Sequence, residues 1–217
     1  MKIDNDTINV LKNFSNINPS IVIKEGNILE TISSSKTIKA KSKVSTNFPH
    51  RFAIYNLGKF ISTLSLFDNP DVEFGENALT VSDGNKSTQL TYSDESTIIK
   101  VPEKDIKLPS IDVSVNITND NLKDVEKALG VLAVPEIIVT GNNNKVYLQA
   151  ADSKNPTGDF YSVEIGTTDK KFKAIFKSEN IKVLPGDYIV EICAKGISKF
   201  YNDTVEYFIA VEQTSTF

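Results

Sequence analysis

The sequence predicts an α+β protein built from two similar domains in tandem. Residues 3–32 and 117–150 share one order of patterns: a polar cap, an apolar stripe at helical spacing, a proline, and two short β-rich runs. The prolines that end the two expected helices are Pro19 and Pro135, which cannot donate a backbone hydrogen bond. A pattern that recurs in this way favours duplication of one helix–sheet unit.

A second correspondence extends the repeat along each half of the chain. Residues 51–56 resemble residues 172–177, and each run leads into a short segment of helical spacing and then a strand near Asp71 or Asp187. Each domain is therefore expected to contain a helix, strands, a second helix and further strands. We place the first domain at 1–100, a connector with Pro102 and Pro109 at about 93–110, and the second domain at 111–217.

The first domain is expected to open with a helix over 4–14, because Ile8, Leu11 and Phe14 follow helical spacing. A second apolar stripe predicts a helix over 56–67. The strands are expected at 20–24, 27–32, 37–44, 52–55, 72–75, 78–82 and 87–92.

Residues 37–44 alternate, which puts Lys39, Lys41 and Lys43 on one face of a strand. We interpret this lysine ladder as a solvated face or a protected sheet edge.

The second domain is expected to begin with a helix over 119–132, in which Leu122, Val125, Leu129 and Leu132 form one stripe. A short second helix is expected over 177–184, before the Pro185–Gly186 turn. The strands are expected at 136–140, 145–151, 160–167, 172–176, 187–194 and 204–212.

Composition and motifs argue against an enzyme. The formal net charge is −4, which by itself does not suggest a protein that coats nucleic acid. Cys193 and His50 are each alone, so neither a thiolate metal site nor a metal-binding histidine pair is expected, and each is assigned a packing or surface role. No phosphate-binding loop and no Gly-x-Ser-x-Gly nucleophile turn occurs, and we expect no cofactor and no metal.

No run approaches the roughly 18 apolar residues that a membrane span needs. The start MKIDNDTINVL has acids where a secretory signal has a basic and then an apolar region, so we expect a protein of the cytoplasm.

Three segments carry a resemblance that runs in order along the whole chain: LKNFSNINPSIVIKEG at 11–26, IYNLGKFISTLSLF at 54–67 and PGDYIVEICAKG at 185–196. They are similar to the DNA polymerase sliding clamps of T-even-type bacteriophages. The resemblance implies the DNA-clamp fold and a closed homotrimeric ring, with antiparallel sheets outside and helices that line a hole for duplex DNA. It also implies a processivity factor without enzymatic activity, which tethers the replicative DNA polymerase in the cytoplasm of the infected bacterial host.

The implied partners are further copies of the chain, duplex DNA, the DNA polymerase and a clamp loader ATPase that opens the ring. Phage late-transcription factors are further candidates. The polymerase would bind a hydrophobic pocket beside the connector, whose residues the sequence does not identify. Subunits would join by pairing of edge strands, for which we choose the strands near 87–92 and 160–167.

The lining of the hole is assigned to lysines on the expected helices, where contact with phosphates attracts DNA of any sequence. The alternative for each is an ordinary solvated lysine, and the expected helices carry as many acids as lysines. The strongest local excess of positive charge lies within residues 169–182. The DNA-binding candidates are Lys12, Lys59, Lys123, Lys127, Lys177 and Lys182.

Two other classes of protein remain open at this point. One is a structural or interaction protein, such as a virion component made of tandem β-rich domains. The other is a hydrolase with a scattered acidic site, which divalent-metal-dependent turnover would reveal.

Overall fold

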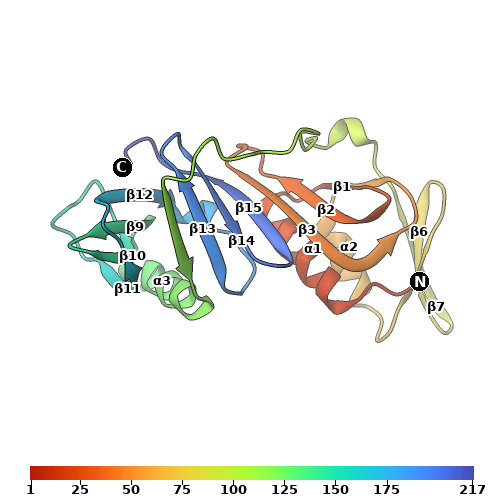
Figure 1. Ribbon diagram of the computed structural model, residues 1–217. Coiled ribbons are helices and arrows are strands. Elements are labelled where there is room, and N and C mark those ends of the chain that lie inside the picture. The colour runs from red at the N-terminus through yellow and green to blue at the C-terminus, as the bar shows by residue number, and fades with distance from the viewer. The chain divides into compact units, whose positions relative to one another are not determined.

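The computed structural model describes all residues, Met1–Phe217, as two compact units, Met1–Lys104 and Asp105–Phe217 (Figure 1). Each unit combines antiparallel strand pairs with α-helix, so the predicted α+β fold of two tandem units is confirmed.

The first unit has two α-helices and several short sheets. The strands β5, β6 and β7 form one antiparallel sheet, β2 pairs with β3, and β1 pairs with β4. The elements are α1 Asn5–Ile17, β1 Ile21–Ile23, β2 Gly26–Ile32, β3 Ile38–Phe48, β4 Phe52–Ile54, α2 Leu57–Leu64, β5 Asp71–Phe74, β6 Ala78–Asp83, β7 Lys86–Thr91 and the 3₁₀ turn η1 Glu95–Thr97.

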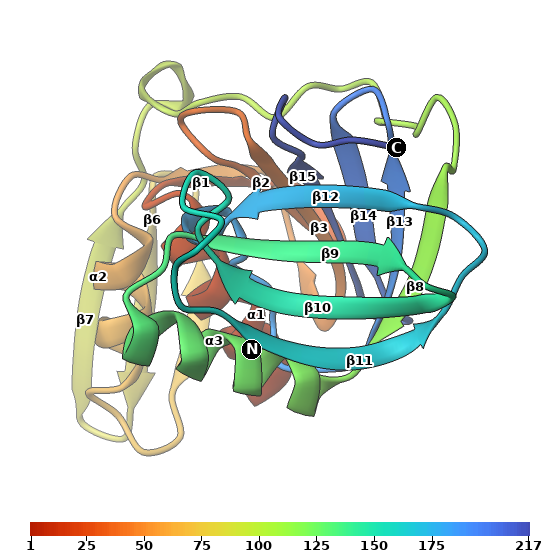
Figure 2. The ribbon, with the colours of Figure 1, turned by 90° about the vertical axis from the view of Figure 1, so that its left-hand side faces the viewer.

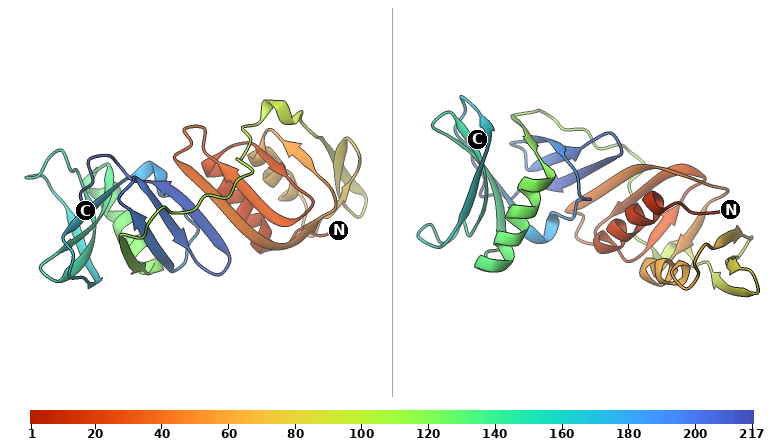
Figure 3. Two further views of the ribbon diagram at one scale, coloured as in Figure 1. Left: turned by 45° about the horizontal axis from the view of Figure 1, so that its top comes forward. Right: turned by 90° about the horizontal axis from the view of Figure 1, so that it is seen from below.

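The two helices of this unit pack against each other, as the right-hand view of Figure 3 shows, and α1 also packs on β3. Leu11 and Phe14 of α1 and Leu57 and Phe60 of α2 are almost completely buried, as their helical spacing predicted. The apolar stripes therefore form the core, and the polar side of α1 faces solvent.

Helix α1 begins at a cap that also joins it to the sheet. The Oδ1 atom of Asp4 accepts the backbone N–H of Thr7 at 2.8 Å, which satisfies one of the donors at the start of the helix. The Oδ2 atom accepts the hydroxyls of Thr7 at 2.8 Å and of Thr46 in β3 at 2.6 Å. One carboxylate thus fixes both the start of α1 and its position on β3.

The second unit has one α-helix. The strand order is β11-β10-β9-β12 in one sheet, and β8, β13, β14 and β15 pair in that order. The elements are β8 Val113–Ile117, α3 Asn119–Leu132, β9 Glu136–Asn142, β10 Lys145–Ala151, β11 Tyr161–Thr167, β12 Phe172–Lys177, the 3₁₀ turn η2 Ser178–Asn180, β13 Tyr188–Cys193, β14 Ile197–Tyr201 and β15 Val205–Ala210.

Helix α3 lies along the sheet of β9 to β12 (Figure 2). Its buried residues Leu122 and Val125 face the sheet, where Val146 and Leu148 of β10 are also buried. The predicted stripe thus lies on the sheet side, although Leu129 and Leu132 at its end are only half-buried.

The second helix predicted for this unit, over 177–184, is wrong. Lys177 ends β12 opposite Glu136, and only Ser178–Asn180 turn, as a 3₁₀ helix. Pro185 follows closely and disfavours helical backbone in the residue before it, so too little chain remains for a stable α-helix. The duplicated pattern has therefore kept two α-helices in the first unit and one in the second.

Two strands, β8 and β14, were not predicted. β8 alternates Val113, Val115 and Ile117 beside the connector, and β14 follows a turn at Gly196, whose positive φ of 92° suits glycine.

The interpretation of the lysine ladder is wrong for Lys39. Lys43 is exposed, but Lys39 is only 4% exposed and pairs with Glu30 at 3.6 Å. Its neighbours Ile38 and Ala40 are buried as well, so both faces of β3 are covered where the strand begins.

Candidate functional site

The exposed face of α1 is polar and carries little charge. Lys12 is exposed on it, and Asn5, Asn9 and Asn16 lie at helical spacing along the same side of the helix. Asp6 in the first turn supplies the opposing charge. The face therefore offers one cation and several amide groups to a ligand.

Helix α2 carries Lys59 in its first turn, exposed to solvent. The side chain of Asn56 caps the helix by accepting the backbone N–H of Lys59 at 2.8 Å. No acid lies within α2, so its exposed face is positive.

Helix α3 presents Lys123 and Lys127, both exposed. A capping box between Thr118 and Asn121 fixes the start of the helix. Acids share the exposed surface, among them Glu126. Neighbouring groups partly shield the Glu126 carboxyl from water, which raises its pKa. The acids of α3 outnumber its two lysines, so positive charge on this helix is confined to the surroundings of Lys123 and Lys127.

The remaining two candidate lysines do not lie on a helix. Lys177 ends β12 and its Nζ is 4.0 Å from the carboxylate of Glu212. Lys182 follows η2, is half-buried and already has an interaction within the chain. The structure thus places four of the six lysines on exposed helix faces.

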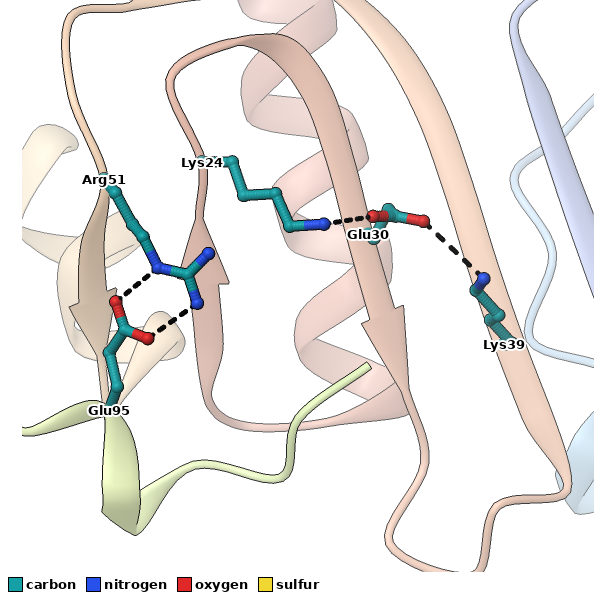
Figure 4. A network of polar contacts seen from close by, with 5 residues as sticks. All are labelled: Lys24, Glu30, Lys39, Arg51 and Glu95. Carbon is teal, nitrogen blue, oxygen red and sulfur yellow. Dashed lines mark hydrogen bonds and ion pairs between the residues drawn. The ribbon is translucent and has the colours of Figure 1, made fainter. Parts of the chain in front are cut away.

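The start of the connector is tied to β4 by a bidentate ion pair. Nε and Nη2 of Arg51 donate to the Glu95 carboxylate of η1 at 2.6 and 2.7 Å (Figure 4). The Arg51 hydrogen bond lowers the pKa of Glu95. In the same region Glu30 binds Lys24 at 3.0 Å and Lys39 at 3.6 Å.

A cavity of about 320 Å³ lies beside these pairs, under the first part of the connector. The sequence did not identify its lining residues, because they come from segments that are far apart along the chain. The apolar lining consists of Ile21, Val22, Ile32, Ile99, Val101 and Pro102, and the charged lining of Lys24, Glu30, Arg51, Lys100 and Glu103.

Two sheets each have one outer edge that is covered. In the first unit, Met1 covers β5, since its backbone exchanges hydrogen bonds with Val72 at 2.7 and 2.8 Å. In the second unit, the C-terminal segment covers β12, since Thr216 and Lys173 exchange backbone hydrogen bonds at 2.8 and 2.9 Å.

The opposite edges of the same two sheets, β7 and β11, pair with a strand of this chain on one side only. These strands are the ones chosen from the sequence as joining surfaces. Unpaired N–H and C=O groups along such an edge can pair with another chain.

Other features of the molecule do not assemble a reaction site. No group of three or more His, Cys, Asp or Glu side chains is placed to hold a metal ion. Cys193 is buried, and the His50 ring packs on Phe52, Phe74 and Tyr92 at 5.9 to 6.4 Å between centroids. None of the helices combines the length and the apolar composition that a membrane-spanning helix needs.

Comparison with known proteins gives the two units separate family matches. Residues 4–101 match the family described as DNA polymerase processivity factor, and residues 114–213 match the family described as gp45 sliding clamp, C terminal.

Curated relatives match along their whole length. The sliding clamp of Vibrio phage KVP40 is 34% identical over 221 residues, which cover 98% of this chain and 99% of the relative. The sliding clamp of Enterobacteria phage T4 is 28% identical over 227 residues, which cover 100% and 99%.

Among solved structures, PCNA of A. fulgidus, bound to the C-terminal region of FEN-1, aligns with a TM-score of 0.69 at 12% identity and covers 96% of both chains. At that identity the likeness concerns the fold alone. The whole-length relatives, the two family matches and the tandem units agree, and the chain belongs to the family of phage sliding clamps, the processivity factors of DNA polymerase.

Proposed function

We propose that three copies of this chain close into a ring around duplex DNA and tether the replicative DNA polymerase to it. The observation that carries the proposal is the pair of unpaired edges, β7 in one unit and β11 in the other. Because the two edges differ, pairing one with the other joins copies head to tail, and such an interface generates either a ring or an open filament. The resemblance to phage clamps favours closure at three copies.

Light scattering tests the assembly directly. We expect a species of three times the 24.0 kDa chain at micromolar concentration and its loss on dilution. A chain that stays monomeric at micromolar concentration contradicts the proposal, because no single chain then encloses DNA.

DNA would be held by enclosure, with weak contacts to phosphates from the helices. Lys12, Lys59, Lys123 and Lys127 are the lysines that we retain for this role, since all four are exposed on helices. Amide groups of α1 would add neutral contacts to phosphate oxygens. Such contacts do not read base sequence, which suits a protein that moves along DNA.

Enclosure makes a prediction that surface binding does not. A preformed ring threads onto a linear duplex with free ends but not onto the same duplex with both ends blocked by bulky proteins. We expect binding only to the free-ended duplex in the absence of a loader. Equal binding to both duplexes would indicate a surface binder and would exclude enclosure as the main means of retention.

The lysines can be tested on the free-ended duplex through salt dependence. Each phosphate contact contributes about 0.9 to the slope of log K against log salt. Lys123→Ala combined with Lys127→Ala should lower that slope and weaken binding on all sequences equally. Lys154→Ala, which removes an exposed lysine from a loop, is the matched control and should leave the slope unchanged. An unchanged slope in the double variant would remove α3 from the DNA-binding surface.

The cavity beside the connector is our candidate for the polymerase. Its apolar floor and mixed charged rim suit a short peptide segment with an apolar anchor. A labelled polymerase terminal peptide should bind the chain and lose affinity on Val22→Asp, whereas Ile189→Asp, on the exposed side of β13, should not change it. Equal affinity in both variants would place the peptide elsewhere.

A clamp loader ATPase would open the ring for loading onto DNA without free ends, as the resemblance to phage clamps implies. Phage late-transcription factors would compete with the polymerase peptide if they use the same cavity. All of these steps would take place in the cytoplasm of the infected host.

A further inference from the structure

The carboxylate of Glu30 on β2 is shared by two lysines at the cavity beside the connector (Figure 4). Its Oε2 atom lies 3.0 Å from Nζ of Lys24, which follows β1, and its Oε1 atom lies 3.6 Å from Nζ of Lys39 on β3. Each carboxylate oxygen is therefore engaged by a different ammonium group. One negative charge serves two positive charges, so the three side chains together keep one positive charge in excess.

The two lysines differ in how much they depend on Glu30. The side chain of Lys39 is 4% exposed, and a buried ammonium group without a carboxylate beside it strongly destabilises a fold. The side chain of Lys24 is 49% exposed, so water can solvate its ammonium group when the ion pair opens. The pair of Glu30 with Lys39 is therefore the permanent one, and Lys24 is the cation that can turn to a ligand in the cavity.

The connector supplies a second cation to the same cavity. Arg51 in the lining is already held by its bidentate bond to Glu95 and is further attracted by Glu103. Lys100 also lines the cavity and is exposed, and Glu95 attracts it without a hydrogen bond between them. Lys24 and Lys100 are thus the two ammonium groups of the lining that a ligand can reach.

Apolar side chains lie beside these cations. Ile99 of the connector is 39% exposed, and Val22 and Val101 of the same lining are half-buried. An apolar side chain of a ligand that covers Ile99 and Val22 would remove apolar surface from water, which favours binding. The cavity therefore suits a ligand that presents an apolar side chain and a carboxylate close together.

We propose that the peptide in this cavity carries a carboxylate next to its apolar anchor, and that Lys24 turns from Glu30 to bind it. Lys100 contacts the same carboxylate from the connector. Glu30 and Lys39 are positioning residues, because they hold Lys24 at the rim without touching the peptide. The inference rests on the proposed function, in which a segment of the polymerase fills the cavity, and it adds the chemistry that selects the segment.

Fluorescence anisotropy with a labelled peptide from the C-terminus of the phage's own polymerase tests the proposal. Lys24→Met keeps an unbranched side chain but removes the charge, and it should weaken binding about three- to tenfold. Lys100→Met should weaken binding as well. Lys43→Met, which changes an exposed lysine of β3 outside the lining, is the matched control and should bind as the natural chain does. The difference between Lys24→Met and the natural chain should shrink at high salt, because ions screen the lost attraction.

Two altered peptides identify the source of the carboxylate. If it is the chain terminus, an amidated peptide should bind the natural chain about as weakly as the unaltered peptide binds Lys24→Met. If it is a side chain, replacement of the acid beside the anchor by its amide should have that effect instead. Whichever change is effective should add little to the loss in Lys24→Met, because the contact it removes is already absent there.

Urea denaturation separates a lost ligand contact from a damaged fold. Lys24→Met should unfold at the same urea concentration as the natural chain, because its ion pair is exposed and Lys39 still neutralises Glu30. A clearly lower midpoint would contradict the exchangeable role of Lys24.

The outcomes distinguish this inference from the proposed function. If the peptide binds Lys24→Met as tightly as Lys43→Met, or neither altered peptide binds more weakly, carboxylate recognition is wrong while the cavity remains the peptide site. If Val22→Asp does not weaken binding either, the peptide lies elsewhere and the assignment of the cavity to the polymerase fails too.

Discussion

Replacement of Asp4 should destabilise the first unit far more than its place near the end of the chain suggests. The carboxylate caps α1 and also binds the hydroxyl of Thr46, so Asp4→Ala removes a helix cap and a link to β3 together. Loss of a cap costs about 1 kcal/mol, and loss of a hydrogen bond to a charged group about 1.5–3 kcal/mol. The hydroxyls of Thr7 and Thr46, both buried, would lose their acceptor. We expect a loss of about 2–4 kcal/mol in the free energy of unfolding.

The same site predicts a pH dependence. Burial acts to raise the pKa of Asp4, but the hydrogen bonds from Thr46 and Thr7 outweigh it and hold that pKa below the ordinary value of 3.8. A carboxyl with a lowered pKa in the folded state contributes stability above its unfolded pKa and loses it as the pH falls through the folded pKa. The difference between the natural chain and Asp4→Ala should therefore be full near neutral pH and shrink below about pH 3.8.

Urea denaturation at one fixed protein concentration measures both effects, since assembly would otherwise shift the apparent stability. Asp6→Ala is the matched control, because Asp6 lies in the first turn of α1 without a capping bond and should cost less than about 1 kcal/mol. Equal losses for Asp4→Ala and Asp6→Ala, or a difference that persists unchanged at pH 3, would refute this account of the cap.

Two further predictions concern single contacts. Arg51→Ala should lower the free energy of unfolding by less than about 1 kcal/mol, since the ion pair of Arg51 with Glu95 is partly exposed. The same variant should speed proteolysis of the connector. An unchanged cleavage rate would show that the pair does not hold η1 in place. Gly141→Ala should destabilise the second unit by about 1–3 kcal/mol, because an added Cβ would lie 2.4 Å from the Phe172 ring. Gly130→Ala in α3 has open space and should instead stabilise by up to about 1 kcal/mol; destabilisation by both glycine variants to the same extent in urea would contradict the steric argument.

Much of the architecture could be predicted from local pattern. The stripes that begin at Ile8 and Leu122 specify α1 and α3 because the side chains of one helix face share one core. The wrong prediction of a helix over 177–184 has a local cause too, since Ile181, Val183 and Leu184 are apolar but lie between a strand and Pro185. β8 alternates clearly and could have been recognised from Val113, Val115 and Ile117.

The candidate surfaces were harder to predict because they depend on distant pairs. Arg51 meets Glu95, and Lys39 meets Glu30, only once the strands have paired, so no spacing along the chain announces either contact. The choice of β7 and β11 as joining strands came from the resemblance, and it remains a prediction. Which edges are covered became visible only when Met1 and the C-terminal segment were seen along β5 and β12.

The unpaired edges also bear on solubility before assembly. An open strand edge rich in β-branched and aromatic residues is a template for aggregation. β7 opens with Lys86, and β11 carries Glu164 together with an irregularity in its pairing with β10 between Val146 and Tyr147. Charges and irregular pairing discourage indiscriminate strand addition. We therefore expect Lys86, Glu164 and the irregular pairing to limit aggregation of the unassembled chain, and we expect neutralisation of both charges to increase it.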